Sequence, residues 1–160
     1  MKKAVVFLIT IMILTVACNH EQPVNLNSNE KVLSITHGRY YGECIGYCEK
    51  YLNISQDSVE VYYRGWDGYG NDLPDTLWAK FNTENNIWNS LISSFSVNDF
   101  MKLDSIYPPL GEVDQGHTYI KVITNLRTKS VSFTEPDTII GTQELDKILF
   151  DIRDFYGISK

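Results

Sequence analysis

Residues 51–64 read Tyr-Leu-Asn-Ile-Ser-Gln-Asp-Ser-Val-Glu-Val-Tyr-Tyr-Arg, and this stretch decides the expected fold. Two runs rich in β-branched and aromatic residues, 51–55 and 59–64, flank the polar turn 56–58. Such a pattern is typical of a β-hairpin. Antiparallel strands can be joined by a short turn, whereas parallel strands need a long crossover. The stretch therefore predicts an antiparallel sheet built from hairpins.

Segments on both sides of this hairpin repeat the strand pattern. Alternation predicts a strand at 32–37, and strand character returns at 76–81. A second hairpin is expected from strands 117–124 and 129–134, which flank the polar turn between them. Together these segments predict about six strands.

Two segments have the apolar spacing of helices. Thr83 is expected to cap a helix over 84–95, and 99–103 to add a short helical turn. Near the C-terminus, Thr142 and Gly157 mark the start and end of an amphipathic helix. The apolar positions that carry the two patterns are Ile87, Leu91, Ile92, Phe95, Leu145, Ile148, Leu149 and Ile152. The predicted fold class is α+β, in the order ββββαββα, with two main helices packed on one face of the sheet.

The chain begins with a basic and then apolar segment. Lys2 and Lys3 precede an apolar run over 4–17, which is typical of a secretory signal. The run ends Leu-Thr-Val-Ala before Cys18 and resembles the lipobox of bacterial lipoproteins, in which the cysteine receives the lipid. We therefore expect a signal peptide at 1–17 and lipidation of Cys18, which would make the membrane a partner through the lipid.

The expected organisation follows from this cleavage site. Residues 18–31 are polar and unpatterned and are predicted to form a flexible tether, and 32–160 a single globular domain. Asn19 is not the aspartate that retains many lipoproteins at the inner membrane, which favours the outer membrane of the bacterial cell envelope.

The charge of the chain is acidic. It holds 14 basic and 20 acidic residues, a net charge of −6, and removing 1–17 leaves a net charge of −8. A polyanion such as nucleic acid is therefore not an expected partner.

The chain has three cysteines. With Cys18 lipidated, Cys44 and Cys48 form an even pair in an oxidising compartment, and a structural disulfide is expected. Two alternatives stay open: a redox-active dithiol, and a metal site completed by His37 or Glu43.

The segment around these cysteines resembles a family signature, C-F-G-x-C-P-x-Y. Cys44, Gly46, Cys48 and Tyr51 match it, whereas Ile45 and Glu49 depart from it. Further likenesses are Tyr63-Arg64-Gly65, Asp99-Phe100 with Leu103, and Asp114 with Thr118-Tyr119. The family is a bacterial domain-of-unknown-function family of exported and lipid-anchored proteins. The resemblance covers roughly 33–156 and brings no activity with it.

The loop 66–75 is the expected place for ligand contacts. Trp66 and Tyr69 are candidates for stacking on a sugar, with Asp67 and Asp72 as polar partners. Asn71 and Asp75 would join these carboxylates in a calcium site, although the spacing does not match a calcium loop. All of these residues are also common turn formers.

Two other patterns bear on chemistry. Asp114 and His117 are candidates for an acid–base pair, without a visible nucleophile beside them. Asp-Ser or Asp-Thr followed by an aliphatic residue resembles an O-glycosylation pattern of exported bacterial proteins. The four acceptors would be Ser58, Thr76, Ser105 and Thr138.

These observations predict a lipid-anchored cell-envelope protein of unknown activity. It is expected to be a non-catalytic binding or structural accessory whose partner is an envelope protein or glycan. No catalytic residue, cofactor or metal ligand is predicted. One alternative is an envelope redox protein or enzyme that uses Cys44 and Cys48, and another is a carbohydrate-binding module that uses Trp66 and Tyr69.

Overall fold

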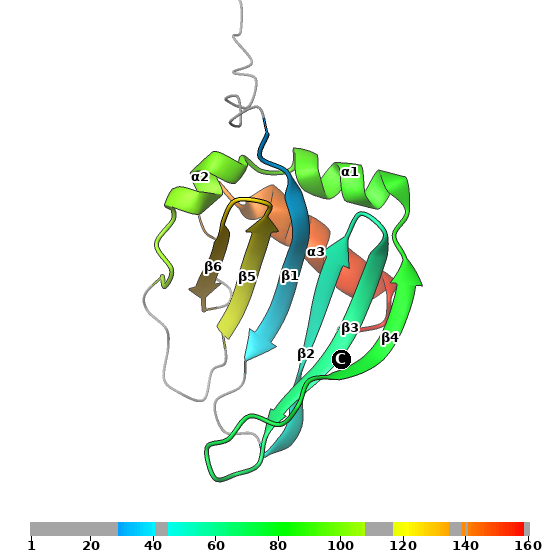
Figure 1. Cartoon of the computed structure of the whole chain (residues 1–160), viewed down its shortest axis with the longest axis vertical. Helices are drawn as coiled ribbons and strands as arrows, with labels where there is room; N and C mark the ends of the chain where they lie inside the picture. The colour runs from blue at the N-terminus through cyan, green and yellow to red at the C-terminus, as the bar shows by residue number, and fades with distance from the viewer. Residues whose placement is uncertain (1–28, 41–44, 108–116, 135–138, 140, 159–160) are drawn as a thin grey trace, which may run out of the picture.

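The computed structural model of the chain describes residues 29–40, 45–107, 117–134, 139 and 141–158. Six strands form one antiparallel sheet in the order β4-β3-β2-β1-β5-β6 (Figure 1). The strands are β1 (Val32–Tyr40), β2 (Gly46–Ser55), β3 (Ser58–Trp66), β4 (Thr76–Asn82), β5 (His117–Thr124) and β6 (Thr128–Phe133). Both predicted hairpins are present, and the α+β class with a six-stranded antiparallel sheet is confirmed.

The described residues form three helices where two main helices were predicted. They are α1 (Asn85–Ser93), α2 (Val97–Lys102) and α3 (Gln143–Phe155), so the element order is ββββααββα. The predicted short turn at 99–103 is in fact α2, whose N-cap Ser96 accepts a hydrogen bond from the Asp99 amide at 3.3 Å. Burial of Val97 and Phe100 in the core stabilises this six-residue helix, which would not persist alone.

The predicted helix caps differ from the observed ones. The N-cap of α1 is Glu84, not Thr83, because the Thr83 hydroxyl donates to the Ser55 carbonyl at 2.9 Å. Thr142 does occupy the N-cap position of α3, yet its hydroxyl donates to the Ile139 carbonyl at 3.0 Å and caps nothing. Both threonines therefore tie a helix start to the preceding chain.

The first two strands are longer than the predicted runs 32–37 and 51–55. Gly38, Arg39 and Tyr40 continue β1 and pair with residues 117–119 of β5. Gly46 begins β2 and pairs with Trp66. The strands are longer than their local pattern indicates because distant partners satisfy their backbone groups.

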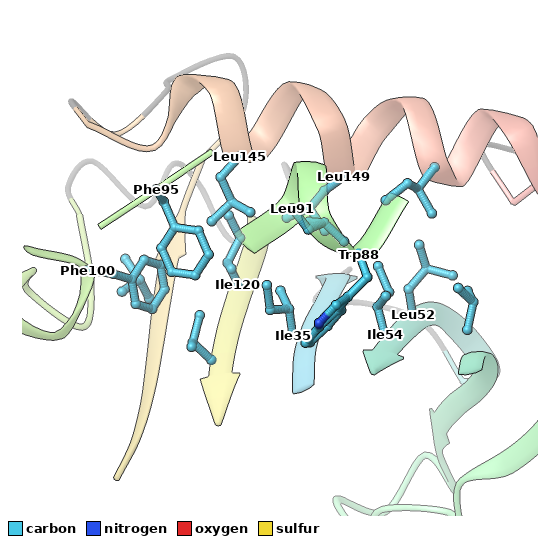
Figure 2. Packing of buried hydrophobic residues seen from close by; sticks show 14 of the residues in the cluster. Ile35, Leu52, Ile54, Trp88, Leu91, Phe95, Phe100, Ile120, Leu145 and Leu149 are labelled. Carbon is cyan, nitrogen blue, oxygen red and sulfur yellow. The ribbon is translucent and has the colours of Figure 1, made fainter. Parts of the chain in front are cut away.

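The hydrophobic core lies between the helices and one face of the sheet, which we call the helix face. Figure 1 shows α3 crossing behind the strands and α1 and α2 along one end of the sheet. Trp88 and Leu91 of α1 and Leu145 and Leu149 of α3 meet strand side chains such as Ile35 (Figure 2). Period-2 alternation along β2, β3 and β5 places their buried apolar residues on the helix face and the intervening residues on the opposite face.

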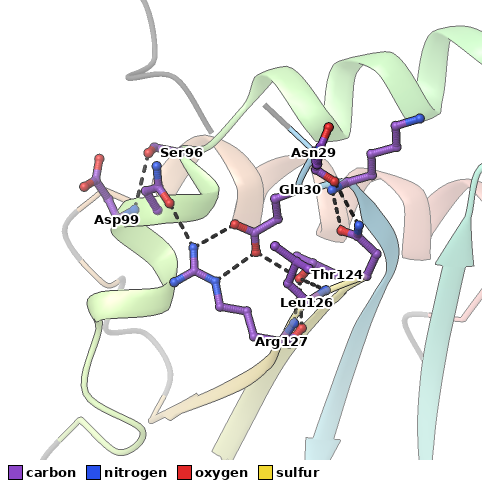
Figure 3. Close-up of polar contacts among 10 residues, drawn as sticks. Asn29, Glu30, Ser96, Asp99, Thr124, Leu126 and Arg127 are labelled. Carbon is purple, nitrogen blue, oxygen red and sulfur yellow. Dashed lines mark hydrogen bonds and ion pairs between the residues drawn. The ribbon is translucent and has the colours of Figure 1, made fainter. Parts of the chain in front are cut away.

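Residues 29–31, the last part of the predicted tether, are held by the β5–β6 turn (Figure 3). The Glu30 carboxylate accepts two hydrogen bonds from Arg127, at 2.8 and 2.9 Å, and one from Thr124 at 2.9 Å. Asn125 bonds to Asn29 and Lys31 through side-chain and backbone groups. The ordered structure thus includes chain ahead of Val32.

Candidate ligand-binding site

A cleft of about 700 Å³ lies on the sheet face opposite the helices, which we call the open face. In the part of the chain that the structure describes, no helix covers this face (Figure 1). The volume is in the range of small-molecule sites. The lining residues come from five strands, β1, β2, β3, β5 and β6, and from Asp75 just before β4: Thr36, Glu49, Tyr51, Asn53, Tyr62, Arg64, Asp75, His117, Tyr119, Lys121, Ile123 and Ser130.

Three tyrosines and a glycine form a row across the strands. Tyr62, Tyr51, Gly38 and Tyr119 are successive cross-strand neighbours from β3 to β5. The rings of Tyr51 and Tyr62 are stacked, with centroids 5.1 Å apart and planes 11° apart. A Cβ atom on Gly38 would lie 2.5 Å from the Tyr119 ring. Glycine at this position therefore lets Tyr119 lie across β1 toward β2.

Asp75 links the tyrosine row to Arg64. Its carboxylate accepts hydrogen bonds from the Tyr51 hydroxyl at 2.8 Å and from Arg64 Nε at 3.2 Å. The Arg64 guanidinium also lies over the Tyr51 ring, 5.2 Å from the centroid. Partial burial acts to raise the pKa of Asp75, but the bonds from Arg64 and Tyr51 outweigh it, so the pKa lies below its usual value. Asp75 is ionised at neutral pH and fixes both neighbours.

Glu49 is the most buried charged group of the cleft. It is 1% exposed, and neither carboxylate oxygen has a hydrogen-bond partner among the described residues. Burial raises the pKa of Glu49. The Tyr119 hydroxyl and the Arg64 charge oppose that shift, although Tyr119 does not meet hydrogen-bond geometry with either oxygen. A buried carboxylate left without a partner costs free energy, which a ligand could recover.

The helix face holds a second pair of buried polar groups. His37 of β1 is fully buried, and its Nε2 lies 3.9 Å from Oδ1 of Asp146 in α3. Burial, with the charges of Arg153 and Arg39, lowers the pKa of His37 to about 3. Burial raises the pKa of Asp146 to about 6, against the charge of Arg39. The pair lies under α3 rather than in the cleft, so it bears on stability.

Hydrogen bonds within the loop 66–75, the predicted place for ligand contacts, hold part of it in place. Asp67 accepts hydrogen bonds from the amides of Tyr69 and Asn71, at 2.7 and 3.1 Å, and from the Asn71 side chain at 2.7 Å. Trp66 is half-buried and pairs with Asp72 in a β-bridge. Tyr69 is 91% exposed. The loop offers one exposed ring, and a sugar site there stays a prediction.

The calcium ligands suggested by sequence do not come together. Asp75 binds Arg64 and Tyr51 in the cleft, whereas Asp67 closes the loop. Within the described residues, no group of three or more histidine, cysteine, aspartate or glutamate side chains could hold a metal ion. A calcium site in this loop is therefore not supported.

Several other predicted sites fall partly or wholly outside the described residues. Cys18, Cys44, Glu43, Asp114 and Thr138 all lie outside them. Cys48 is half-buried in β2, at the irregular register between Tyr47 and Glu49, and its pairing with Cys44 stays a prediction.

The remaining glycosylation candidates differ in exposure. Thr76 and Ser105 are exposed, and Ser58 is half-buried beside Ser55. Thr76 at the start of β4 and Ser105 after α2 are therefore the more accessible acceptors, and modification stays a prediction.

Sequence reasoning missed most of the cleft. From the sequence, Tyr51 and Tyr62 are predicted only as strand residues of the hairpin 51–64, and Glu49 only as a departure from the family signature. The signal was present in the alternation of Glu49, Tyr51 and Asn53, which places three polar or aromatic side chains on one strand face. Their convergence with Tyr119 depends on the pairing of β1 with β5.

No protein-family model matches the chain, and a search of curated proteins found no match. The resemblance to the C-F-G-x-C-P-x-Y family therefore stays a prediction. The helices among the described residues are all too short or too polar to cross a membrane.

Proposed function

We propose that the protein is a non-catalytic binding protein of the bacterial cell envelope. Lipid on Cys18 would anchor it, and the cleft on the open face would hold a small polar ligand. The proposal rests on Glu49, a carboxylate that is 1% exposed and has no hydrogen-bond partner among the described residues, in a cleft of about 700 Å³.

The fixed side chains around Glu49 support binding. Asp75 holds Tyr51 and Arg64 through hydrogen bonds of 2.8 and 3.2 Å, and Tyr62 stacks on Tyr51. Side chains already held in place lose little conformational entropy when a ligand arrives. The cleft is thus largely preformed, as small-molecule sites usually are.

Amide chemical shifts of the ¹⁵N-labelled full chain in detergent micelles test the binding site. A set of small amines, neutral sugars and carboxylic acids is added, and at least one class is expected to shift amides of β2, β3 and β5 around the cleft. Asn53→Trp should abolish these shifts by filling the cleft. Lys147→Trp, on the exposed side of α3, should leave them unchanged.

Two results would overturn the proposed site. One is that none of the three classes shifts the cleft amides. The other is that shifts are confined to loop 66–75, which would favour the carbohydrate-binding alternative at Trp66 and Tyr69.

Anchoring is tested separately by mass and fractionation. Protein from bacterial membranes should have the mass of residues 18–160 plus lipid, and Cys18→Ser should leave residues 1–17 attached and no lipid. An unlipidated wild-type protein in the soluble fraction would contradict the anchor while leaving the cleft untouched.

A further inference from the structure

Hydrogen-bond acceptors dominate the cleft around the tyrosine row. The Tyr51 hydroxyl donates its proton to Asp75 and the Tyr62 hydroxyl donates its proton to Glu60, each at 2.8 Å. Since a phenol has one proton to donate, both oxygens can only accept a further hydrogen bond. An ionised Glu49 is also an acceptor without donors. A ligand that satisfies these groups must bring donors.

Among the described residues that line the cleft, no cation forms an ion pair with Glu49, although the charges of Arg64 and Arg153 act on it. Arg64 is matched to Asp75 through two hydrogen bonds, at 3.2 and 3.4 Å, and its guanidinium covers the Tyr51 ring. Lys121 lies farther along the sheet, in line across the strands with Thr36, Asn53 and Glu60. In β2 this line passes through Asn53, which is four residues from Glu49. A positively charged ligand group beside Glu49 would therefore balance the charge of this carboxylate.

We propose that the ligand carries a protonated amine whose ammonium group docks on Glu49, beside Tyr119. This inference rests on the proposed function, since it specifies the ligand of the same cleft. An ammonium group supplies three donors and one positive charge in a compact form. The Tyr119 ring beside Glu49 adds a further attraction for a cation. The net charge of −6 favours the approach of cations over that of anions.

Neutral and anionic ligands fit the cleft less well. A hydroxyl group can donate to Glu49, but it leaves the buried charge unbalanced. A carboxylate would meet two carboxylates, Glu49 and Asp75, and among the described lining residues at this end Arg64 is the one cation that would attract it. The expected order of affinity is therefore amine, alcohol, carboxylate.

The test uses three probes that share a ring and differ in one group: benzylamine, benzyl alcohol and benzoate. Each is titrated into the ¹⁵N-labelled full chain in detergent micelles, and the cleft amides report affinity and location. Benzylamine is expected to bind at least about tenfold more tightly than benzyl alcohol, because its ammonium group both donates to Glu49 and balances the buried charge, whereas the alcohol only donates. Benzoate should bind most weakly.

Two glutamate-to-glutamine variants distinguish a specific role of Glu49 from the general effect of removing one negative charge. Glu49→Gln should reduce the affinity for benzylamine to that for benzyl alcohol and leave the alcohol within about twofold. Glu144→Gln removes an exposed carboxylate on α3, away from the cleft, and it should leave benzylamine binding nearly unchanged. Gln at position 49 also removes a buried charge, so folding should not suffer.

Each outcome separates this inference from the proposed function. If benzyl alcohol or benzoate equals benzylamine at the cleft, or if Glu49→Gln leaves amine affinity intact, the amine inference fails and cleft binding stands. If neutral sugars shift the cleft amides and benzylamine does not, the amine inference fails as well, while ligand binding in the cleft stands. If benzylamine binds only outside the cleft and no other ligand class enters it, both proposals fail.

Discussion

Replacing Asp146 with asparagine is expected to stabilise the folded protein at neutral and higher pH. Asp146 is 6% exposed in the first turn of α3, and its Oδ1 lies 3.9 Å from Nε2 of His37 and has no hydrogen-bond partner among the described residues. Burial raises its pKa from 3.8 to about 6 because the ionised form loses hydration, while Arg39 acts in the opposite direction. Ionised Asp146 is therefore a cost to folding.

The size of the effect follows from the pKa shift. A rise of about two units corresponds to about 3 kcal/mol, at about 1.4 kcal/mol per unit. The folded pKa is raised, so the stabilisation is fully present below pH 3.8 and is lost as the pH rises through about 6. Asparagine mimics the protonated carboxyl at every pH. The variant should thus gain up to about 3 kcal/mol near pH 8 and almost nothing below pH 3.8.

Urea denaturation followed by tryptophan fluorescence measures this gain, since Trp88 is buried in the core. The matched control is Asp151→Asn on the exposed side of the same helix, which changes charge by the same amount without burial. A free energy of unfolding that does not rise in Asp146→Asn near pH 8 would refute the reasoning. An equal rise at low and high pH would do so as well, because the effect must disappear when Asp146 is protonated.

Three further results are expected. Arg127→Ala should lower the Tm, measured by circular dichroism, because it removes two hydrogen bonds from a buried carboxylate in the network of Figure 3. Gly38→Ala should weaken benzylamine binding and cost about 1–3 kcal/mol in a urea titration, because a Cβ atom 2.5 Å from the Tyr119 ring forces that ring to move. Cys44 and Cys48 should resist alkylation until reduced, with a reduction potential below about −300 mV, as a structural disulfide requires.

A matched variant or a measured potential tests each of these results. Lys129→Ala removes a neighbouring cation that bonds to Ser105, and an equal fall in Tm would contradict the role given to Arg127. Gly38→Ala should cost less in a Tyr119→Ala background, and an unchanged cost would show that the two do not clash. A potential between about −200 and −120 mV would favour the redox alternative for the cysteine pair.

The hairpins were predictable because their signals are local. Residues 51–64 and 117–134 each combine two strand-forming runs with a short polar turn, and both hairpins are present. The amphipathic pattern of α3 was equally clear, since its apolar positions recur at helical spacing. Local propensity and periodicity were sufficient for these elements.

Elements with weak local signals were predicted less well. The helix α2 has six residues and depends on the burial of Val97 and Phe100. The end of β1 and the start of β2 contain glycines, which argue against strand, and they are held by pairing with β5 and β3. Their structure is decided by partners that lie far away in the sequence.

Sequence alone determined the hairpins, the sheet class and the acidic charge. Only the tertiary structure decided that the Tyr119 ring lies over Gly38, and that Asp75 binds Arg64 rather than a loop neighbour. The physical reason is the distance along the sequence over which each effect acts. Turn chemistry and periodicity act over a few residues, whereas the cleft depends on which strands pair and which groups burial leaves without partners.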